Sequence, residues 1–204
     1  MDASLALLII AWVAYLAVHS WLATNSVKQG IQGRFHFTSQ QYRLLYVIFA
    51  SVSLLPVVYL IIIPTSESLW QHQGIVKILL DGLSVLALVG FILVARSYNM
   101  MSFMGVTSEL DKDSFKISWL HRFVRHPWYF FGLIIIWSRD MNTAWLVSCI
   151  CITAYLIIGS RLEDNKLIEQ YGARYQTYKE KIPGLIAIPG CYLSRQEVDK
   201  IESM

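Results

Sequence analysis

The sequence predicts an all-α, polytopic membrane protein with about five transmembrane helices, and three observations support this prediction. Hydrophobic residues make up 55% of the 204-residue chain, and the mean hydropathy is +0.48, an excess typical of membrane proteins. Apolar runs recur at lengths close to the about 20 residues that a helix needs to cross a bilayer. Lysine and arginine fall mainly between these runs and after the last one, as in membrane proteins with one basic face.

The remaining composition excludes several classes of protein. A formal net charge of +3 is too small to indicate a nucleic-acid partner. Cys149, Cys151 and Cys191 have neither CxxC nor Cys/His spacing, so we predict no metal site and interpret them as core or lipid-facing residues. The residues before the first apolar run lack the basic region of a secretory signal, and we expect this run to be retained as a span.

Three apolar runs give the expected spans of the front half, at residues 5–23, 42–63 and 75–95. The first contains His19, which we interpret as an interfacial or core residue, with a contribution to a substrate cavity as the alternative. Pro56 removes a backbone donor from the second span and predicts a kink. In the third span Asp81 follows Lys77 by four residues, which favours an ion pair on one helical face, with a role in the cavity or in proton handling as the alternative.

The last two expected spans form a C-terminal helical hairpin. A fourth helix is expected from Pro127, a residue favoured in the first helical turn, to Trp137, and a fifth begins at Thr143. The fourth helix rises only about 16 Å, so we expect its first residues to lie below the headgroups in a protein-lined pocket.

A cytoplasmic helical tail is expected to continue the fifth helix as far as Tyr178. One stripe of this helix holds residues at alternating spacings of four and three: Asp164, Ile168, Tyr171, Tyr175 and Tyr178. We interpret its tyrosines as packing residues beneath the bundle. Pro183 and Pro189 then end regular structure, and residues 196–204 are expected to be solvated.

The distribution of basic residues predicts an orientation with the N-terminus outside and the C-terminus in the cytoplasm. In this orientation only Lys77 and Arg139 lie outside, and the basic linker 24–41 is cytoplasmic. We expect a single domain over residues 1–204, with a three-helix front half (1–96) and a C-terminal part (120–189) that carries the hairpin and tail.

Two polar clusters are expected to meet at the cytoplasmic face. Arg125, His126 and Tyr129 lie around the start of the fourth helix, and Glu163 and Asp164 lie near the end of the fifth. Ionisable groups at membrane depth are costly and often mark a function, whereas simple anchoring of a helix end is the alternative for the first cluster.

This combination of side chains suits a zwitterionic ligand that also carries a positive charge. A ligand carboxylate pairs with Arg125 or His126, and Glu163 or Asp164 accepts hydrogen bonds from an ammonium group or from ribose hydroxyls. The aromatic face of Tyr129 tolerates a sulfonium. No Walker lysine or GxGxxG motif competes with this interpretation.

One ordered set of residues within 120–189 resembles the C-terminal half of the isoprenylcysteine carboxyl methyltransferase family, including its short prokaryotic members. The matching blocks are Arg125-His126-Pro127-x-Tyr129-x-x-Gly132, Glu163-Asp164, Leu167, Tyr171-Gly172-x-x-Tyr175-x-x-Tyr178 and Ile182-Pro183. The chain departs from the family pattern at Asp164, where a second glutamate is common, and at residues 121–123, where a tyrosine is usual.

The resemblance implies that S-adenosylmethionine binds near the cytoplasmic face. It places His126 and Tyr129 at the methionine part of this donor, with Pro127 and Gly132 shaping the backbone around it. The family pattern also implies that the acidic pair and the apolar residue after it hold the adenosine side, at Glu163, Asp164 and Leu167.

The expected function is therefore an integral membrane S-adenosylmethionine-dependent methyltransferase. Its expected acceptor is apolar or lipid-like, either an isoprenylcysteine carboxylate, a thiol or an amine, and membrane lipid is the expected surrounding partner. Arg125, His126 and Glu163 are the expected catalytic residues. Arg125 orients an anionic acceptor or fixes the acidic pair, and His126 or Glu163 removes a proton if the acceptor is a thiol or amine.

Two other classes of protein remain open at this point. A membrane reductase of the sterol-reductase type shares related C-terminal architecture, although it needs more basic residues for a nicotinamide phosphate than the sequence offers. A non-enzymatic haem-binding or accessory membrane subunit is the other class, with His19 and His126 as axial ligands.

Overall fold

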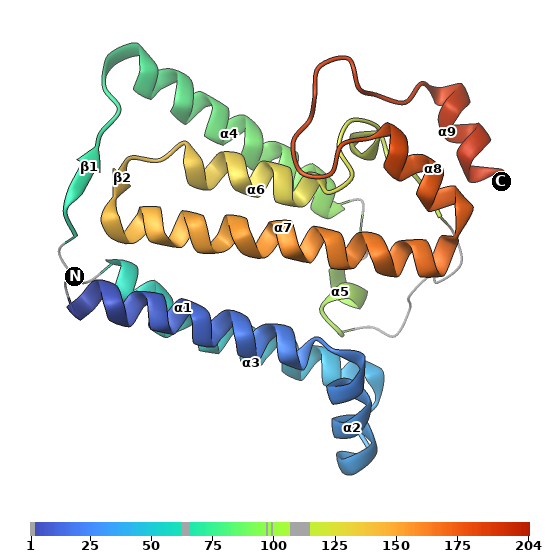
Figure 1. Ribbon diagram of the computed structural model, residues 1–204, viewed down its shortest axis with the longest axis horizontal. Helices are drawn as coiled ribbons and strands as arrows, with labels where there is room; N and C mark the ends of the chain where they lie inside the picture. The colour runs from blue at the N-terminus through green and yellow to red at the C-terminus, as the bar shows by residue number, and fades with distance from the viewer. Residues whose placement is uncertain (1–2, 63–65, 97, 99, 107–114) are drawn as a thin grey trace. The chain divides into compact units, whose positions relative to one another are not determined.

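The computed structural model describes residues 3–62, 66–96, 98, 100–106 and 115–204, and these are mostly helical. Contacts divide the chain into two compact units. The first unit comprises Met1–Gln71, Tyr98–Leu110 and Asp140–Cys151, and the second comprises His72–Ser97, Asp111–Arg139 and Ile152–Met204. Figure 1 labels the elements of both units.

Among the described residues, four helices are long and apolar enough to cross a membrane, which supports an integral membrane protein. They are α1 (Ala3–Leu22), α3 (Ser39–Ile62), α4 (Gly74–Arg96) and α7 (Thr143–Tyr171). The first three agree closely with the predicted front-half spans, although Ile63, the last residue of the second predicted span, lies outside the described residues. A shorter apolar helix, α6 (Pro127–Trp137), has the predicted bounds.

The first unit is built on α1 and α3, which lie side by side. The Tyr42 hydroxyl of α3 donates to the Leu22 carbonyl at 2.6 Å, and the indole of the buried Trp12 donates to Ser148 Oγ at 3.0 Å. The Tyr46 hydroxyl lies 2.8 Å from His19 Nε2. His19 is thus hydrogen-bonded within its own unit.

Smaller elements of the first unit were not anticipated from sequence. Part of the expected basic linker forms α2 (Asn25–Phe35), and a short helix, α5 (Met100–Phe103), follows α4 in the sequence. Two short strands, β1 (Ser68–Trp70) and β2 (Met141–Asn142), pair antiparallel. Pro56 lies inside α3, which continues past it to Ile62.

The second unit centres on α4 packed along α6. Gly90 makes this close approach possible, because a Cβ there would lie only 2.5 Å from the Phe131 ring. The Trp128 indole donates to the Phe91 carbonyl at 3.1 Å, and their two rings stack. These contacts hold the start of α6 in place.

The predicted Lys77 and Asp81 pair is confirmed on α4. Lys77 Nζ lies 3.4 Å from the carboxylate of Asp81, and Arg139, directly beyond α6, approaches the same carboxylate at 3.3 Å. Between the two helices, the hydroxyls of Ser84 and Ser138 are 2.5 Å apart in a buried contact. Polar contacts therefore connect α4 to the C-terminal end of α6.

The C-terminal tail differs from the prediction in two respects. The expected continuous helix is wrong, because α7 ends at Tyr171 and Gly172, with φ +59°, separates it from α8 (Ala173–Lys181). L-residues with side chains rarely adopt this backbone conformation, which explains the glycine.

The expected solvated end is also wrong. It forms α9 (Arg195–Glu202), which begins with a capping box between Ser194 and Glu197 and buries Val198 and Ile201. These apolar residues join a buried cluster that includes Tyr175 and Tyr178, in agreement with the packing role expected for the tyrosines.

Candidate functional site

The Arg125-His126 segment is fixed in place by the loop that follows α8. The backbone N–H groups of Arg125 and His126 donate to the carbonyls of Pro183 (2.9 Å) and Gly184 (3.0 Å). A Cβ on Gly184 would come within 3.1 Å of Arg125 Nη2, so the glycine leaves room for the guanidinium. Pro127 is the first residue of α6 and turns the chain into this helix.

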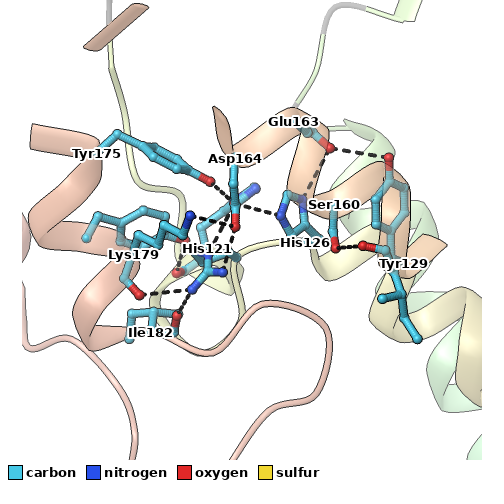
Figure 2. Close-up of polar contacts among 12 residues, drawn as sticks. His121, His126, Tyr129, Ser160, Glu163, Asp164, Tyr175, Lys179 and Ile182 are labelled. Atoms are coloured by element: carbon cyan, nitrogen blue, oxygen red, sulfur yellow. Dashed lines mark hydrogen bonds and ion pairs between the residues drawn. The ribbon is translucent and has the colours of Figure 1, made fainter. Parts of the chain in front are cut away.

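Asp164 is the centre of the polar cluster, and its side chain is only 4% exposed. Arg125 donates to it from Nη2 at 2.8 Å and from Nε at 3.3 Å. His126 Nε2 lies 3.0 Å from Oδ1, the Tyr175 hydroxyl donates to the same oxygen at 2.5 Å, and Lys179 Nζ lies 3.8 Å from Oδ2. Figure 2 shows Tyr175, Lys179 and His126 converging on this carboxylate.

The remaining donors of Arg125 tie the site to the tail. Its Nη1 donates to the carbonyl of Lys179 at 3.0 Å and to that of Ile182. The guanidinium is thus engaged on both sides, and the Arg125 side chain is 11% exposed. This geometry favours the second of its two expected roles, fixing the acidic pair.

Glu163 differs from its neighbour because its side chain is 48% exposed. His126 Nδ1 lies 3.2 Å from Glu163 Oε2, and the Tyr129 hydroxyl donates to the same oxygen at 3.2 Å. The rings of His126 and Tyr129 stack with centroids 5.4 Å apart and planes 13° from parallel. The result is an oriented, accessible carboxylate beside an aromatic face, visible on the right of Figure 2.

Burial and hydrogen bonding shift the pKa values of three groups around the site. Burial lowers the pKa of His126, but hydrogen bonds to Asp164 and Glu163 outweigh it, and the pKa is raised overall. Burial, reinforced by the hydrogen bond to Asp164, raises the pKa of Tyr175. Burial lowers the pKa of His121 to about 4, so this neighbouring histidine is neutral at pH 7.

The structure brings most of the predicted site residues together in the second unit. Direct contacts connect a core set of five: Arg125, His126, Tyr129, Glu163 and Asp164. Gly132 lies three residues after Tyr129 on α6, and a Cβ there would meet nothing within 4 Å. Leu167 instead packs against the apolar cluster of the tail.

Sequence reasoning did not assign Tyr175, Lys179, Pro183 or Gly184 to the site. A signal for Tyr175 was present, since it lies on the same predicted helical stripe as Asp164, but that stripe was interpreted as packing. The contacts of Lys179, Pro183 and Gly184 depend on a loop that returns after α8, and no periodicity predicts such a return.

These residues have the chemistry needed to hold S-adenosylmethionine. The exposed carboxylate of Glu163 can accept hydrogen bonds from ribose hydroxyls or an ammonium group, and the ring of Tyr129 can face a positive sulfonium. Gly132 lies one helical turn from Tyr129, and a Cβ there would meet nothing within 4 Å. The charged and hydrogen-bonding groups of these residues therefore fit this ligand.

Comparison with known proteins finds methanethiol S-methyltransferases at modest sequence identity. The chain is 30% identical over 129 residues to a methanethiol S-methyltransferase of Pseudomonas sp., covering 59% of this chain and 48% of the relative. It is 28% identical over 151 residues to methanethiol S-methyltransferase 2 of Bradyrhizobium diazoefficiens (67% and 56% coverage), and 30% identical over 153 residues to methanethiol S-methyltransferase 1 of the same organism (69% and 53%).

The chain spans about half the length of the curated relatives it matches. No family model matches the sequence. No solved structure matches the chain. The sequence similarity relates this chain to methyltransferases.

Proposed function

We propose that this protein is an integral membrane methyltransferase that uses S-adenosylmethionine to methylate a small thiol. The observation that carries the proposal is the accessible carboxylate of Glu163, which His126 and Tyr129 hold in one orientation at 3.2 Å each. The names of the relatives support both the reaction class and a thiol acceptor.

The site residues divide into a group that faces the donor and a group that supports it. Glu163 accepts from the ammonium or ribose groups of the donor, and Tyr129 presents its ring to the sulfonium. Gly132 leaves room along α6. Asp164 and Arg125 are largely buried and hold His126 in position.

The bound donor supplies an electrophilic methyl group on a sulfonium. The protein contributes alignment of the acceptor sulfur with that methyl group, exclusion of water, and removal of the thiol proton. Glu163 and His126 are the two groups of the site suited to take this proton. The membrane gives an apolar thiol a route to the site, while the charged donor comes from the aqueous side.

Several finer features belong to the same proposal. They are membership of the isoprenylcysteine carboxyl methyltransferase-like group, a single domain over residues 1–204, five crossings with α6 and α7 as a hairpin, and a cytoplasmic site with the N-terminus outside. The four long apolar helices and the resemblance around Arg125, His126 and Pro127 support this arrangement.

The haem-binding alternative receives little support from the contacts of His126. Both of its ring nitrogens lie within 3.2 Å of carboxylate oxygens. A haem iron needs one imidazole nitrogen as a ligand, so axial ligation requires breaking one of these contacts.

A direct assay of methyl transfer tests the proposal. Purified protein in detergent is incubated with S-adenosylmethionine and methanethiol, and dimethyl sulfide is measured by gas chromatography. We expect product from the native protein and from an Asp81→Asn control, and a loss of at least about 100-fold in Glu163→Gln. Binding of NADPH with no methyl transfer to methanethiol or larger thiols would instead support a reductase.

A further inference from the structure

We propose that His126 is a fixed imidazolium cation, held between Asp164 and Glu163, and that Glu163 is therefore the proton acceptor of the site. The charge state follows from the contacts of the ring alone. The assignment of the proton acceptor rests on the proposed thiol methylation.

The two hydrogen-bonding contacts of the ring carry the argument. His126 Nε2 lies 3.0 Å from Asp164 Oδ1, and Nδ1 lies 3.2 Å from Glu163 Oε2. Neutral imidazole has one donor nitrogen and one acceptor nitrogen, whereas imidazolium has two donors. A neutral ring would point a lone pair at one of these anionic oxygens, so the cationic ring satisfies both contacts.

The proton belongs on the ring rather than on either carboxyl group. The ordinary pKa values of glutamate and histidine are about 4.3 and about 6.5, which favours a proton on histidine when the two share one hydrogen bond. Glu163 Oε2 also accepts from Tyr129, and Asp164 accepts from Arg125 and Tyr175. In each of these contacts a carboxylate oxygen acts as an acceptor, as an ionised carboxylate provides.

Some of the groups around the ring of His126 favour its positive charge, and others disfavour it. Burial of His126 and the cations of Arg125 and Lys179, which share Asp164 with it, disfavour a further positive charge. The two carboxylates outweigh burial, and the pKa of His126 lies above its ordinary value. His121 is neutral at pH 7 and adds no competing charge.

This charge state settles which group can act as a base. An imidazolium has no lone pair for the thiol proton, so His126 orients Glu163 instead of accepting the proton itself. His126 and Tyr129 both contact Oε2 of Glu163, and the side chain is 48% exposed, so its carboxylate retains capacity to accept from a ligand.

In the proposed transfer, the S–H proton of the acceptor passes to the Glu163 carboxylate, and the sulfur electron pair forms a bond to the methyl carbon. The bond between that carbon and the donor sulfur breaks, and its electron pair remains on the donor sulfur. Glu163 then releases the proton to water.

Nitrogen NMR of the full-length protein measures the charge state directly. The chain has five histidines, and a His126→Gln variant identifies the His126 signals in protein labelled with ¹⁵N-histidine. We expect both nitrogens of His126 to show imidazolium shifts at pH 7.5, where an ordinary exposed histidine is mostly neutral. A neutral tautomer at this pH would overturn the proposal.

One variant and one control sharpen this measurement. Glu163→Gln should move the midpoint of the His126 titration to lower pH, because it removes one of the two carboxylates in contact with the ring. Asp81→Asn, on α4 and near the C-terminal end of α6, should leave the midpoint of the His126 titration unchanged. An unchanged midpoint in Glu163→Gln would contradict a ring held by two carboxylates.

Different results would contradict the proposed charge state and the proposed reaction. A cationic His126 in a protein that does not methylate thiols would contradict the function and leave the charge state intact. A protein that methylates methanethiol with a neutral His126 at pH 7.5 would contradict the inference and leave the function intact.

Discussion

The described residues of the second unit include two arginine–aspartate pairs, one beside each end of α6, which differ mainly in burial. Arg125 and Asp164 are 2.8 Å apart with side chains 11% and 4% exposed. Arg139 and Asp81 are 3.3 Å apart with side chains 46% and 48% exposed. The same chemical pair is therefore shielded at the proposed site and open at the opposite end of the helix.

Burial and the surrounding hydrogen-bond network, rather than the ion pair by itself, give the Arg125–Asp164 pair its importance. Exposed pairs contribute about 0–1 kcal/mol, whereas removing one partner of a buried pair costs about 3–5 kcal/mol because the other charge is left uncompensated. Asp164 also accepts from His126 and Tyr175. Loss of this one carboxylate consequently affects several groups at once.

Asp164→Asn should have the largest effect on stability. The change leaves the charge of Arg125 without its buried partner, and we expect it to destabilise the protein by about 3–5 kcal/mol. Denaturant unfolding in mixed micelles, followed by circular dichroism, measures this difference. A loss no larger than that of Asp81→Asn would show that burial does not separate the two pairs.

Tyr175→Phe should have the next largest effect. It removes the hydroxyl that donates to Asp164 at 2.5 Å but keeps the ring in its apolar cluster. A hydrogen bond to a charged group contributes about 1.5–3 kcal/mol, and we expect a loss of that size in the same unfolding assay. Tyr171→Phe, in the partly buried part of the cluster, is the matched control and should change stability less.

The pH dependence of stability isolates His126. Its pKa is raised in the folded state, so its contribution is fully present below the unfolded pKa of about 6.5 and is lost as pH rises through the folded pKa. Stability of the native protein should therefore fall above neutral pH relative to His126→Gln. Parallel curves for the two proteins between pH 6 and pH 9 would contradict a raised pKa.

Asp81→Asn should have the smallest effect, below about 1 kcal/mol, because the side chains of Asp81 and of both cations near it are about half exposed and are not buried within the protein. Thermal unfolding at low and high salt tests this expectation. A large loss that persists at high salt would mean that the pair at the far end of α6 is shielded after all.

Apolar length and helix-boundary signals predicted much of the fold. The bounds of α6 followed from Pro127 at its start and the polar turn after Trp137, and the start of α7 was predicted at Thr143. The short helix α2 was missed because Gly30 and Gly33 lower the intrinsic helix propensity of this segment. The break at Gly172 was missed because the tyrosine spacing continues across it.

The candidate site was predictable in its members but only partly in their contacts. Two polar clusters at the ends of adjacent helices led to the expectation that His126 and Glu163 meet, and they lie 3.2 Å apart. The sequence did not distinguish the burial of Asp164 from the exposure of Glu163. That difference depends on Tyr175 and on the loop after α8, which tertiary folding brings to the site.

Calorimetric titration with S-adenosylmethionine tests the central claim, that Glu163 presents its carboxylate to the methyl donor. We predict that the native protein and Asp81→Asn bind with equal affinity, and that Glu163→Gln binds about 10- to 100-fold more weakly, as loss of a charge-assisted hydrogen bond requires. Equal binding by Glu163→Gln and the native protein would contradict the claim.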